Sequence, residues 1–241
     1  SEPTVTLATS ATSIAENAGS SLTLTATLSG ATDQNVTVVL GTSGTSTEGT
    51  DYTDGSGAVD DITITAGSTT GTVSFTPTDD SVYEGNETAI IAISSVTGEA
   101  SESGTQAVTI TITENESAPT VTLTTSATSI TENAGSSLTL TATLSGATNA
   151  DVTVALSTSG GATEGTDYTD GSGNIDDIVI SAGSTTGTVS FTPSDDSVYE
   201  DNETATIAIS SVSGGSATES GTQTVTITIT DNESAGSVTL A

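Results

Sequence analysis

The stretch "SLTLTATLS" at residues 21–29 alternates apolar and hydroxyl-bearing side chains with a period of two. This alternation puts leucines on one face and threonines on the other, which is typical of a half-buried strand. The pattern recurs in "NVTVVL" (35–40), "DITITA" (61–66), "TVSFT" (72–76) and "AVTITIT" (107–113). Thr also fits the pleated backbone well. The sequence therefore predicts an all-β chain, although a net charge of −31 with only 32% hydrophobic residues is by itself common in disordered segments.

The sequence contains two copies of one repeat unit. "SIAENAGSSLTLTATLSGAT" (13–32) returns almost unchanged as "SITENAGSSLTLTATLSGAT" (129–148), and "PTDDSVYEGNETA" (77–89) returns as "PSDDSVYEDNETA" (193–205). The two copies start 116 residues apart (129 − 13), which is far longer than the ~20–50 residues of a solenoid unit. We expect one domain at residues 1–116 and another at 117–233. The strand number and spacing favour immunoglobulin-like Greek-key β-sandwiches, stacked head to tail because the linker is very short.

Residues 234–241, "SAGSVTLA", resemble the start of the second copy, "SAPTVTLT" (117–124). This segment is expected to be the first strand of a further repeat. An alternative is that it completes a neighbouring subunit by strand donation, so that separate chains polymerise.

The charge balance excludes several classes of function. The chain has 31 Asp and Glu but no Lys, Arg or His, so no ion pair can form between its side chains. Nucleic acids and anionic lipid surfaces are bound through Lys and Arg, and neither is an expected partner. No apolar run approaches the ~20 residues that cross a bilayer, so no membrane insertion is expected in this segment. The absence of His, Cys, Lys and Arg, with only 2% aromatic residues, argues against an enzyme, including a glycosidase.

The acidic residues fall mainly in the connections between expected strands, and several of these connections can meet at one pole of a sandwich. Like charges at about 4 Å would repel by ~4 kcal/mol per pair at an effective dielectric constant of about 20. Oxygen-only ligands in flexible loops suit Ca²⁺ better than Mg²⁺, and Zn²⁺ prefers His or Cys. The sequence therefore predicts calcium as the cofactor.

Four motifs occur in the same order in both copies: "ENAG" (16–19, 132–135), "GTDY" (49–52, 165–168), "DDSVYEGNE" (79–87) or "DDSVYEDNE" (195–203), and a tail "ENE" (114–116) or "DNE" (231–233). On these motifs the sequence resembles tandem Calx-β domains, the calcium-binding sandwiches of sodium–calcium exchangers and of many large bacterial surface proteins. The tail departs from the consecutive aspartates of the calcium-sensing members. Glu87 and Glu203 are expected at the start of a strand, where they would modulate the electrostatic field.

The resemblance implies a set of calcium ligands in each copy. They are side chains except for the two valines, which would use the backbone carbonyl: Glu16, Asp51, Asp79, Asp80, Val82, Glu84, Glu114, Asn115 and Glu116 in the first copy, and Glu132, Asp167, Asp195, Asp196, Val198, Glu200, Asp231, Asn232 and Glu233 in the second.

Together these features favour a calcium-binding structural repeat of a secreted fibrous surface protein, such as an adhesin stalk, an extracellular filament or a biofilm matrix component. Its expected location is extracellular, at the cell surface, and its expected partners are neighbouring copies of the same repeat. The chain also lacks every trypsin site, since it has no Lys or Arg. The alternatives are a calcium-sensor module that regulates a membrane transporter, a filament subunit that polymerises by strand donation, and a ligand-binding adhesin tip.

Overall fold

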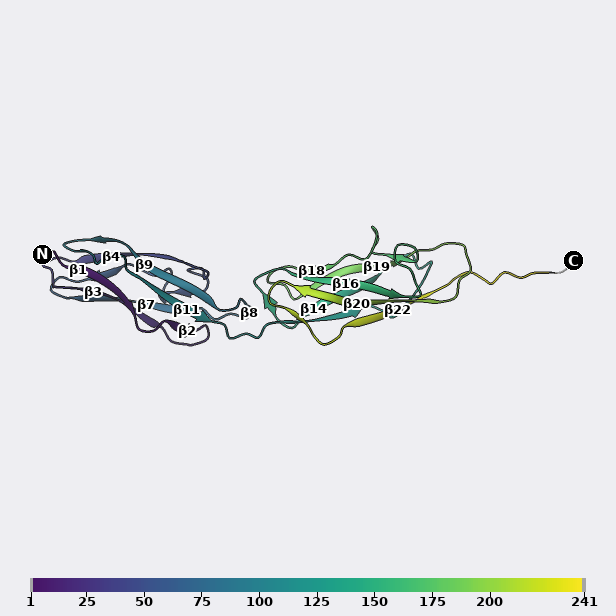
Figure 1. The fold of residues 1–241 in the computed structure, drawn as a ribbon, viewed down its shortest axis with the longest axis horizontal. Coiled ribbons are helices and arrows are strands. Elements are labelled where there is room, and N and C mark those ends of the chain that lie inside the picture. The colour runs from purple at the N-terminus through teal and green to yellow at the C-terminus, as the bar shows by residue number, and fades with distance from the viewer. Residues whose placement is uncertain (1, 240–241) are drawn as a thin grey trace. The chain divides into compact units, whose positions relative to one another are not determined.

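The structure, a computed structural model, describes residues 2–239. These residues form two compact units (Figure 1). Within the described range, unit 1 comprises residues 2–80 and 84–116, and unit 2 comprises residues 81–83 and 117–239. Both units are built from strands, which confirms the predicted all-β sandwich fold. None of the described residues forms a helix that could cross a membrane.

Unit 1 is a sandwich of two five-stranded sheets with the strand orders β10-β1-β3-β7-β5 and β2-β11-β9-β4-β6. Its strands are β1 (Thr4–Thr9), β2 (Ser13–Ala15), β3 (Leu22–Leu28), β4 (Val36–Gly44), β5 (Tyr52–Thr53), β6 (Ile62–Ile64), β7 (Thr70–Pro77), β9 (Glu87–Thr97), β10 (Ser101–Glu102) and β11 (Ala107–Thr113).

The first strand of the sandwich is split between the two sheets. β1 pairs antiparallel with β3, whereas β2 pairs in parallel with β11 of the other sheet. The connecting residues 10–12 carry the chain across one edge of the sandwich. This split places the residue after β2 beside the residue after β11, a juxtaposition that shapes the acidic site described below.

The core of unit 1 follows the alternation seen in the sequence. In β3, Leu22, Leu24, Ala26 and Leu28 point inward and pack against residues of the opposite sheet. Tyr52 is 1% exposed, and its ring stacks on Phe75 with ring centroids 4.6 Å apart. A buried ring of this size anchors the chain firmly. Tyr52 therefore fixes the position of its neighbour Asp51 beside the end of β7.

Unit 2 repeats the architecture, with sheet orders β17-β19-β14-β12-β21 and β13-β22-β20-β16-β18. Tyr168 stacks on Phe191 at the same centroid distance of 4.6 Å. Its strands are β12 (Thr120–Thr125), β13 (Ser129–Thr131), β14 (Leu138–Leu144), β15 (Ala147–Thr148), β16 (Val152–Gly160), β17 (Tyr168–Thr169), β18 (Ile178–Ile180), β19 (Thr186–Pro193), β20 (Glu203–Ser213), β21 (Thr218–Glu219) and β22 (Thr224–Thr230). β8 (Val82–Tyr83) also belongs to unit 2, where it pairs in parallel with β15.

The last segment shows no strand at residues 234–239. Leu240 and Ala241, which complete the expected strand of a further repeat, lie outside the described residues. A strand requires a partner strand, so both expectations for this segment stay predictions.

Candidate metal centre

The acidic tail of unit 1 lies beside the end of β2. Ile14 of β2 pairs with Ile112 of β11, and the two strands run parallel, so the residues that follow them leave the sheet at the same end. Glu16 comes directly after β2, and its N–H donates to the carbonyl of Thr113 (3.0 Å). Glu114 comes directly after β11. The sheet register therefore brings together two motifs almost 100 residues apart in sequence.

Three carboxylates form what we call the tail cluster. In unit 1 it consists of Glu16, Glu114 and Glu116, with one ligand oxygen from each lying within 4.8 Å of the others. Glu16 is only 7% exposed. The equivalent residues of unit 2, which form the same arrangement, are Glu132, Asp231 and Glu233.

A second group forms the loop cluster, which in unit 1 consists of Asp51, Glu84 and Glu87, again within 4.8 Å. Asp51 is held by its buried neighbour Tyr52 and by the N–H of Thr47, which donates to Asp51 Oδ2 (2.5 Å). Glu87 is the first residue of β9. The loop cluster of unit 2 consists of Asp167, Glu200 and Glu203.

Hydrogen bonds connect the tail cluster of unit 1 to the backbone of the segment between β7 and β9. Glu114 Oε2 accepts from the N–H groups of Glu84 (2.6 Å) and Gly85 (2.9 Å). Glu16 Oε1 accepts from the N–H of Asp80 (3.2 Å). Hydrogen bonds to a charged group are worth roughly 1.5–3 kcal/mol each. The backbone conformation at Asp80, Glu84 and Gly85 is therefore coupled to the carboxylates of the tail cluster.

The proton affinities of these groups reflect their crowding. Burial raises the pKa of Glu16 to about 7 from its ordinary 4.5, against the hydrogen bond from Asp80 and with help from the charge of Glu114. Burial, followed by the charge of Asp51, also raises the pKa of Glu87 to about 7. Burial would raise the pKa of Glu114 too, but hydrogen bonds from the N–H groups of Glu84 and Glu116 outweigh it and lower that pKa. Without a cation, each cluster of unit 1 therefore tends to retain a proton near neutral pH.

One oxygen in each tail cluster is buried without a hydrogen-bond partner among the described residues. These atoms are Glu116 Oε2 and Glu233 Oε2. A buried acceptor without a partner costs about 1–3 kcal/mol, and more when it is charged. No side chain of the chain is cationic, so an ion pair within the protein cannot supply the partner. A hard divalent cation fits this donor set, because Ca²⁺ takes 6–8 oxygen ligands in flexible geometry.

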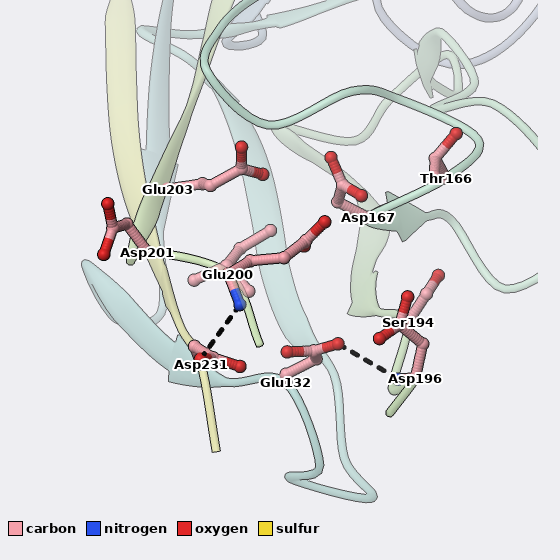
Figure 2. Close-up of a pocket in the computed structure, with 10 residues that line it drawn as sticks. Glu132, Thr166, Asp167, Ser194, Asp196, Glu200, Asp201, Glu203 and Asp231 are labelled. Atoms are coloured by element: carbon pink, nitrogen blue, oxygen red, sulfur yellow. Dashed lines mark hydrogen bonds between the residues drawn. The ribbon is translucent and has the colours of Figure 1, made fainter. Parts of the chain in front are cut away.

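In unit 2 the loop cluster and two members of the tail cluster, Glu132 and Asp231, line one pocket (Figure 2). Seven carboxylates line it, namely those of Glu132, Asp167, Asp196, Glu200, Asp201, Glu203 and Asp231. The carboxylates of Glu203 and Asp167 flank that of Glu200, and Glu132 lies beneath them with its Oε1 accepting from the N–H of Asp196 (3.0 Å). Burial, followed by nearby Asp167, raises the pKa of Glu203. Such a concentration of negative charge in a partly enclosed space attracts cations strongly.

The structure thus brings most of the expected acidic side chains together. Both clusters of unit 1 are drawn from the predicted set apart from Glu87, and those of unit 2 apart from Glu203. The two glutamates are at the start of their strands, as expected, but they also lie within ligand distance of Asp51 and Asp167, respectively. Their spacing of three residues from Glu84 and Glu200 was the available signal.

The other predicted ligands are not members of these clusters. The charges of Asp79 and Asp195 act on Glu116 and Glu233. Asn115 donates through Nδ2 to Glu116 Oε1 (2.8 Å), and Asn232 donates to Glu233 Oε1 (2.6 Å). Coordination stays a prediction for these residues, as it does for the side chains of Asp80 and Asp196 and the carbonyls of Val82 and Val198.

The Calx-beta domain family model matches residues 1–116 and again residues 114–233, which together span nearly the whole chain. The chain belongs to the Calx-beta family. Calx-beta domains are calcium-binding modules, and the family is one of binding and regulatory domains rather than of catalytic ones. Among curated proteins, none matches the sequence significantly.

Solved structures similar to this chain include two CBD12 structures and a bacterial integrin-binding protein, all at low sequence identity. CBD12 from CALX1.2 is 16% identical, with 93% of this Calx-beta chain and 99% of that chain covered and a TM-score of 0.40. The calcium binding domain CBD12 of CALX1.1 is also 16% identical, and the match covers 83% of this chain and 77% of that chain with a TM-score of 0.38. Invasin, a bacterial integrin-binding protein, is 19% identical, and the match covers 95% of this chain and 40% of that chain with a TM-score of 0.43.

Proposed function

We propose that the chain is a calcium-binding structural repeat of a secreted fibrous surface protein, such as an adhesin stalk, a filament or a biofilm matrix component. The observation that carries this proposal is the convergence of two carboxylate clusters in each unit, in a chain that contains no basic side chain at all. The buried oxygens of Glu116 and Glu233, which have no hydrogen-bond partner among the described residues, add support because a bound cation would satisfy them.

Calcium would be held by the tail cluster and the loop cluster of each unit. When bound, it would supply positive charge and accept the oxygen lone pairs that now face one another. Glu114 would then be fixed in the position from which it accepts from the N–H groups of Glu84 and Gly85. The segment between β7 and β9 and the residues after β11 would be stabilised together. An array of such repeats would gain stiffness wherever calcium is abundant.

An extracellular location agrees with this role. Extracellular modules typically bind calcium with dissociation constants of about 10⁻⁴–10⁻³ M. The chain has no Lys or Arg and hence no trypsin site, a useful property outside a cell. The two nearly identical units also suit a protein whose useful property is length. We infer that the partners are neighbouring copies of the same repeat.

A calcium-sensor module of a membrane transporter is the second candidate, and the hydrogen bonds from residues 80–85 to Glu16 and Glu114 favour it. Through these bonds, a change at the tail cluster would alter the conformation of a loop. The two roles differ in where calcium acts. A structural role requires a large gain in stability, whereas a sensor requires a local rearrangement in a domain that stays folded without the ion.

Thermal unfolding of the two-unit chain in calcium and in EDTA, at fixed ionic strength, tests the proposal. At free calcium of about 100 times the dissociation constant, each site adds ~2.7 kcal/mol to the free energy of unfolding. We therefore expect a large drop in the midpoint on chelation, with little rescue by an equal concentration of Mg²⁺. An unchanged midpoint would defeat the structural role. A chain that stays fully folded in EDTA at the working temperature, and in which chelation alters hydrogen exchange only in residues 79–87, would favour the sensor.

A further inference from the structure

Two adjacent apolar side chains of unit 2 are exposed to solvent. Val198 is 58% exposed and Tyr199 is 49% exposed. They follow Asp196 in a segment without regular secondary structure. The Tyr199 hydroxyl donates to Asp201 Oδ1 (3.3 Å), so the tip of the side chain is held while its ring remains open to solvent. One exposed apolar residue is ordinary, and the adjacent pair gains meaning from what its equivalent in the first repeat contacts.

The equivalent residues of the first repeat show what such a pair can bind. Val82 and Tyr83 form β8, which pairs in parallel with β15, with Val82 opposite Ala147 and Tyr83 opposite Thr148. The N–H of Asn149 donates to the Tyr83 carbonyl (3.3 Å). Both side chains of β8 are half-buried, in contrast to Val198 and Tyr199. The "VY" dipeptide is therefore able to pair with the edge that "SGAT" (145–148) presents.

The first repeat carries the same edge without a strand partner. Its "SGAT" occupies residues 29–32, and residues 29–35 form no strand. The local conformation matches that of the second repeat, since the N–H of Gly67 donates to the Thr32 carbonyl (2.8 Å) as Gly183 does to Thr148 (2.8 Å). Ala31 is exposed there. Within the described residues, the chain thus has a "VY" dipeptide without a strand partner in one repeat and an "SGAT" edge without a strand partner in the other.

We propose that Val198–Tyr199 of one molecule pairs with Ala31–Thr32 of a second copy of this chain. The register would follow β8 and β15, with the N–H of Asp33 donating to the Tyr199 carbonyl. This inference deepens the proposed function and rests on it, because it names the segments through which neighbouring copies would associate. The two surfaces differ, so the contact is heterologous, and it builds chains or rings of molecules rather than symmetric dimers in which one surface meets itself.

The interaction would be weak and sensitive to salt. It consists of a two-residue ladder and two apolar side chains, and it must form between chains that each carry a net charge of −31. Long-range repulsion between them falls off over a Debye length of about 8 Å at an ionic strength of about 0.15 M. Raising the salt concentration should therefore strengthen the association.

Sedimentation equilibrium of the 241-residue chain over a series of concentrations tests this proposal, in millimolar calcium and constant salt. We expect the average mass to rise with concentration. The double variant Val198→Ser/Tyr199→Ser should abolish the rise, and so should Asp33→Pro, which removes the N–H donor. Ala31→Glu is a second acceptor variant in case the proline disturbs folding. Val179→Ser is the matched control, because Val179 is 54% exposed on β18, and it should associate like the original chain.

Mixing the two kinds of variant provides the sharpest version of the test. The double variant keeps its "SGAT" edge and the Asp33→Pro variant keeps its "VY" dipeptide, so the mixture should form one-to-one complexes and nothing larger. A monomeric original chain at every concentration overturns the proposal, as does association that survives both variants or a mixture that stays monomeric. If the calcium role failed, the unfolding midpoint would not change on chelation. The two failures are therefore distinguishable.

Discussion

Replacing Glu16 with Gln should change the stability of unit 1 in opposite directions with and without calcium. Glu16 is 7% exposed, and its Oε1 accepts from the N–H of Asp80 (3.2 Å). Gln has almost the same shape, and its carbonyl oxygen can accept the same hydrogen bond. The substitution therefore removes one buried negative charge with little change in packing.

The size of the effect without calcium follows from the proton affinity. The pKa of Glu16 is about 7 in the folded protein against an ordinary value of 4.5. At 1.36 kcal/mol for each pKa unit, holding the ionised group in the fold at pH 8 costs at most about 3.4 kcal/mol. Gln avoids this cost. In EDTA at pH 8, Glu16→Gln should thus raise the midpoint of unit 1 by up to roughly 10 °C. In calcium the variant lacks a charged ligand and should melt below the original chain.

Differential scanning calorimetry in EDTA and in calcium measures both effects, because it can resolve separate transitions of the two units. The control is Glu2→Gln, which makes the same change in net charge at an exposed position. It should shift either midpoint only slightly. If Glu16→Gln lowered the midpoint in EDTA, or raised it equally in both conditions, the reasoning from buried charge and cation binding would be wrong.

Further predictions concern the same site and its support. In EDTA, the free energy of unfolding should fall as pH rises from about 4.5 through about 7, because Glu16 and Glu87 have pKa values of about 7 in the folded protein and hold protons that the unfolded chain has already released. Urea titrations at several pH values would measure this dependence. Saturating calcium should remove or reverse it. Glu87→Gln should weaken calcium binding by unit 1 at least tenfold in calorimetric titrations, and unchanged affinity would remove Glu87 from the ligand set. Asn115→Asp should tighten calcium binding but lower stability in EDTA, since it loses the bond to Glu116 Oε1 and adds a charge; a variant equally stable in EDTA would contradict this. Gly44→Ala should lower the free energy of unfolding by about 3 kcal/mol or more in urea titrations, because Gly44 has a φ of 124° and an added Cβ would overlap the carbonyl of Thr88. A decrease below ~1 kcal/mol would show that the backbone moves to accommodate the Cβ.

The sequence was sufficient to predict most of the fold. The alternation in residues 21–29 has a simple physical cause, since a strand with one buried face must alternate, and β3 buries Leu22, Leu24 and Leu28 as expected. The split of the first strand could not be predicted in this way. Residues 4–15 contain two short apolar segments whose pairing partners, β3 and β11, are set by the closure of the whole sandwich.

The candidate site was predictable in composition but not in grouping. The sequence placed many carboxylates in connections that could converge, and the structure separates them into a tail cluster and a loop cluster. Glu87 shows why its spacing of three residues from Glu84 was not a sufficient signal for the grouping. Its place in the loop cluster depends on the pairing of Glu87 with Ile112 across the sheet and on Tyr52 holding Asp51, neither of which local spacing reveals.

The central claim is that divalent cations from the medium supply the positive charge that this chain lacks. A crystal structure determined from calcium-containing buffer, with anomalous scattering recorded for calcium, tests it most directly. Anomalous peaks are expected among the carboxylates of Glu16, Glu114 and Glu116, among those of Asp51, Glu84 and Glu87, and at the equivalent sites of unit 2. Clusters that spread apart in such crystals, with no anomalous peak between their oxygens, would contradict it.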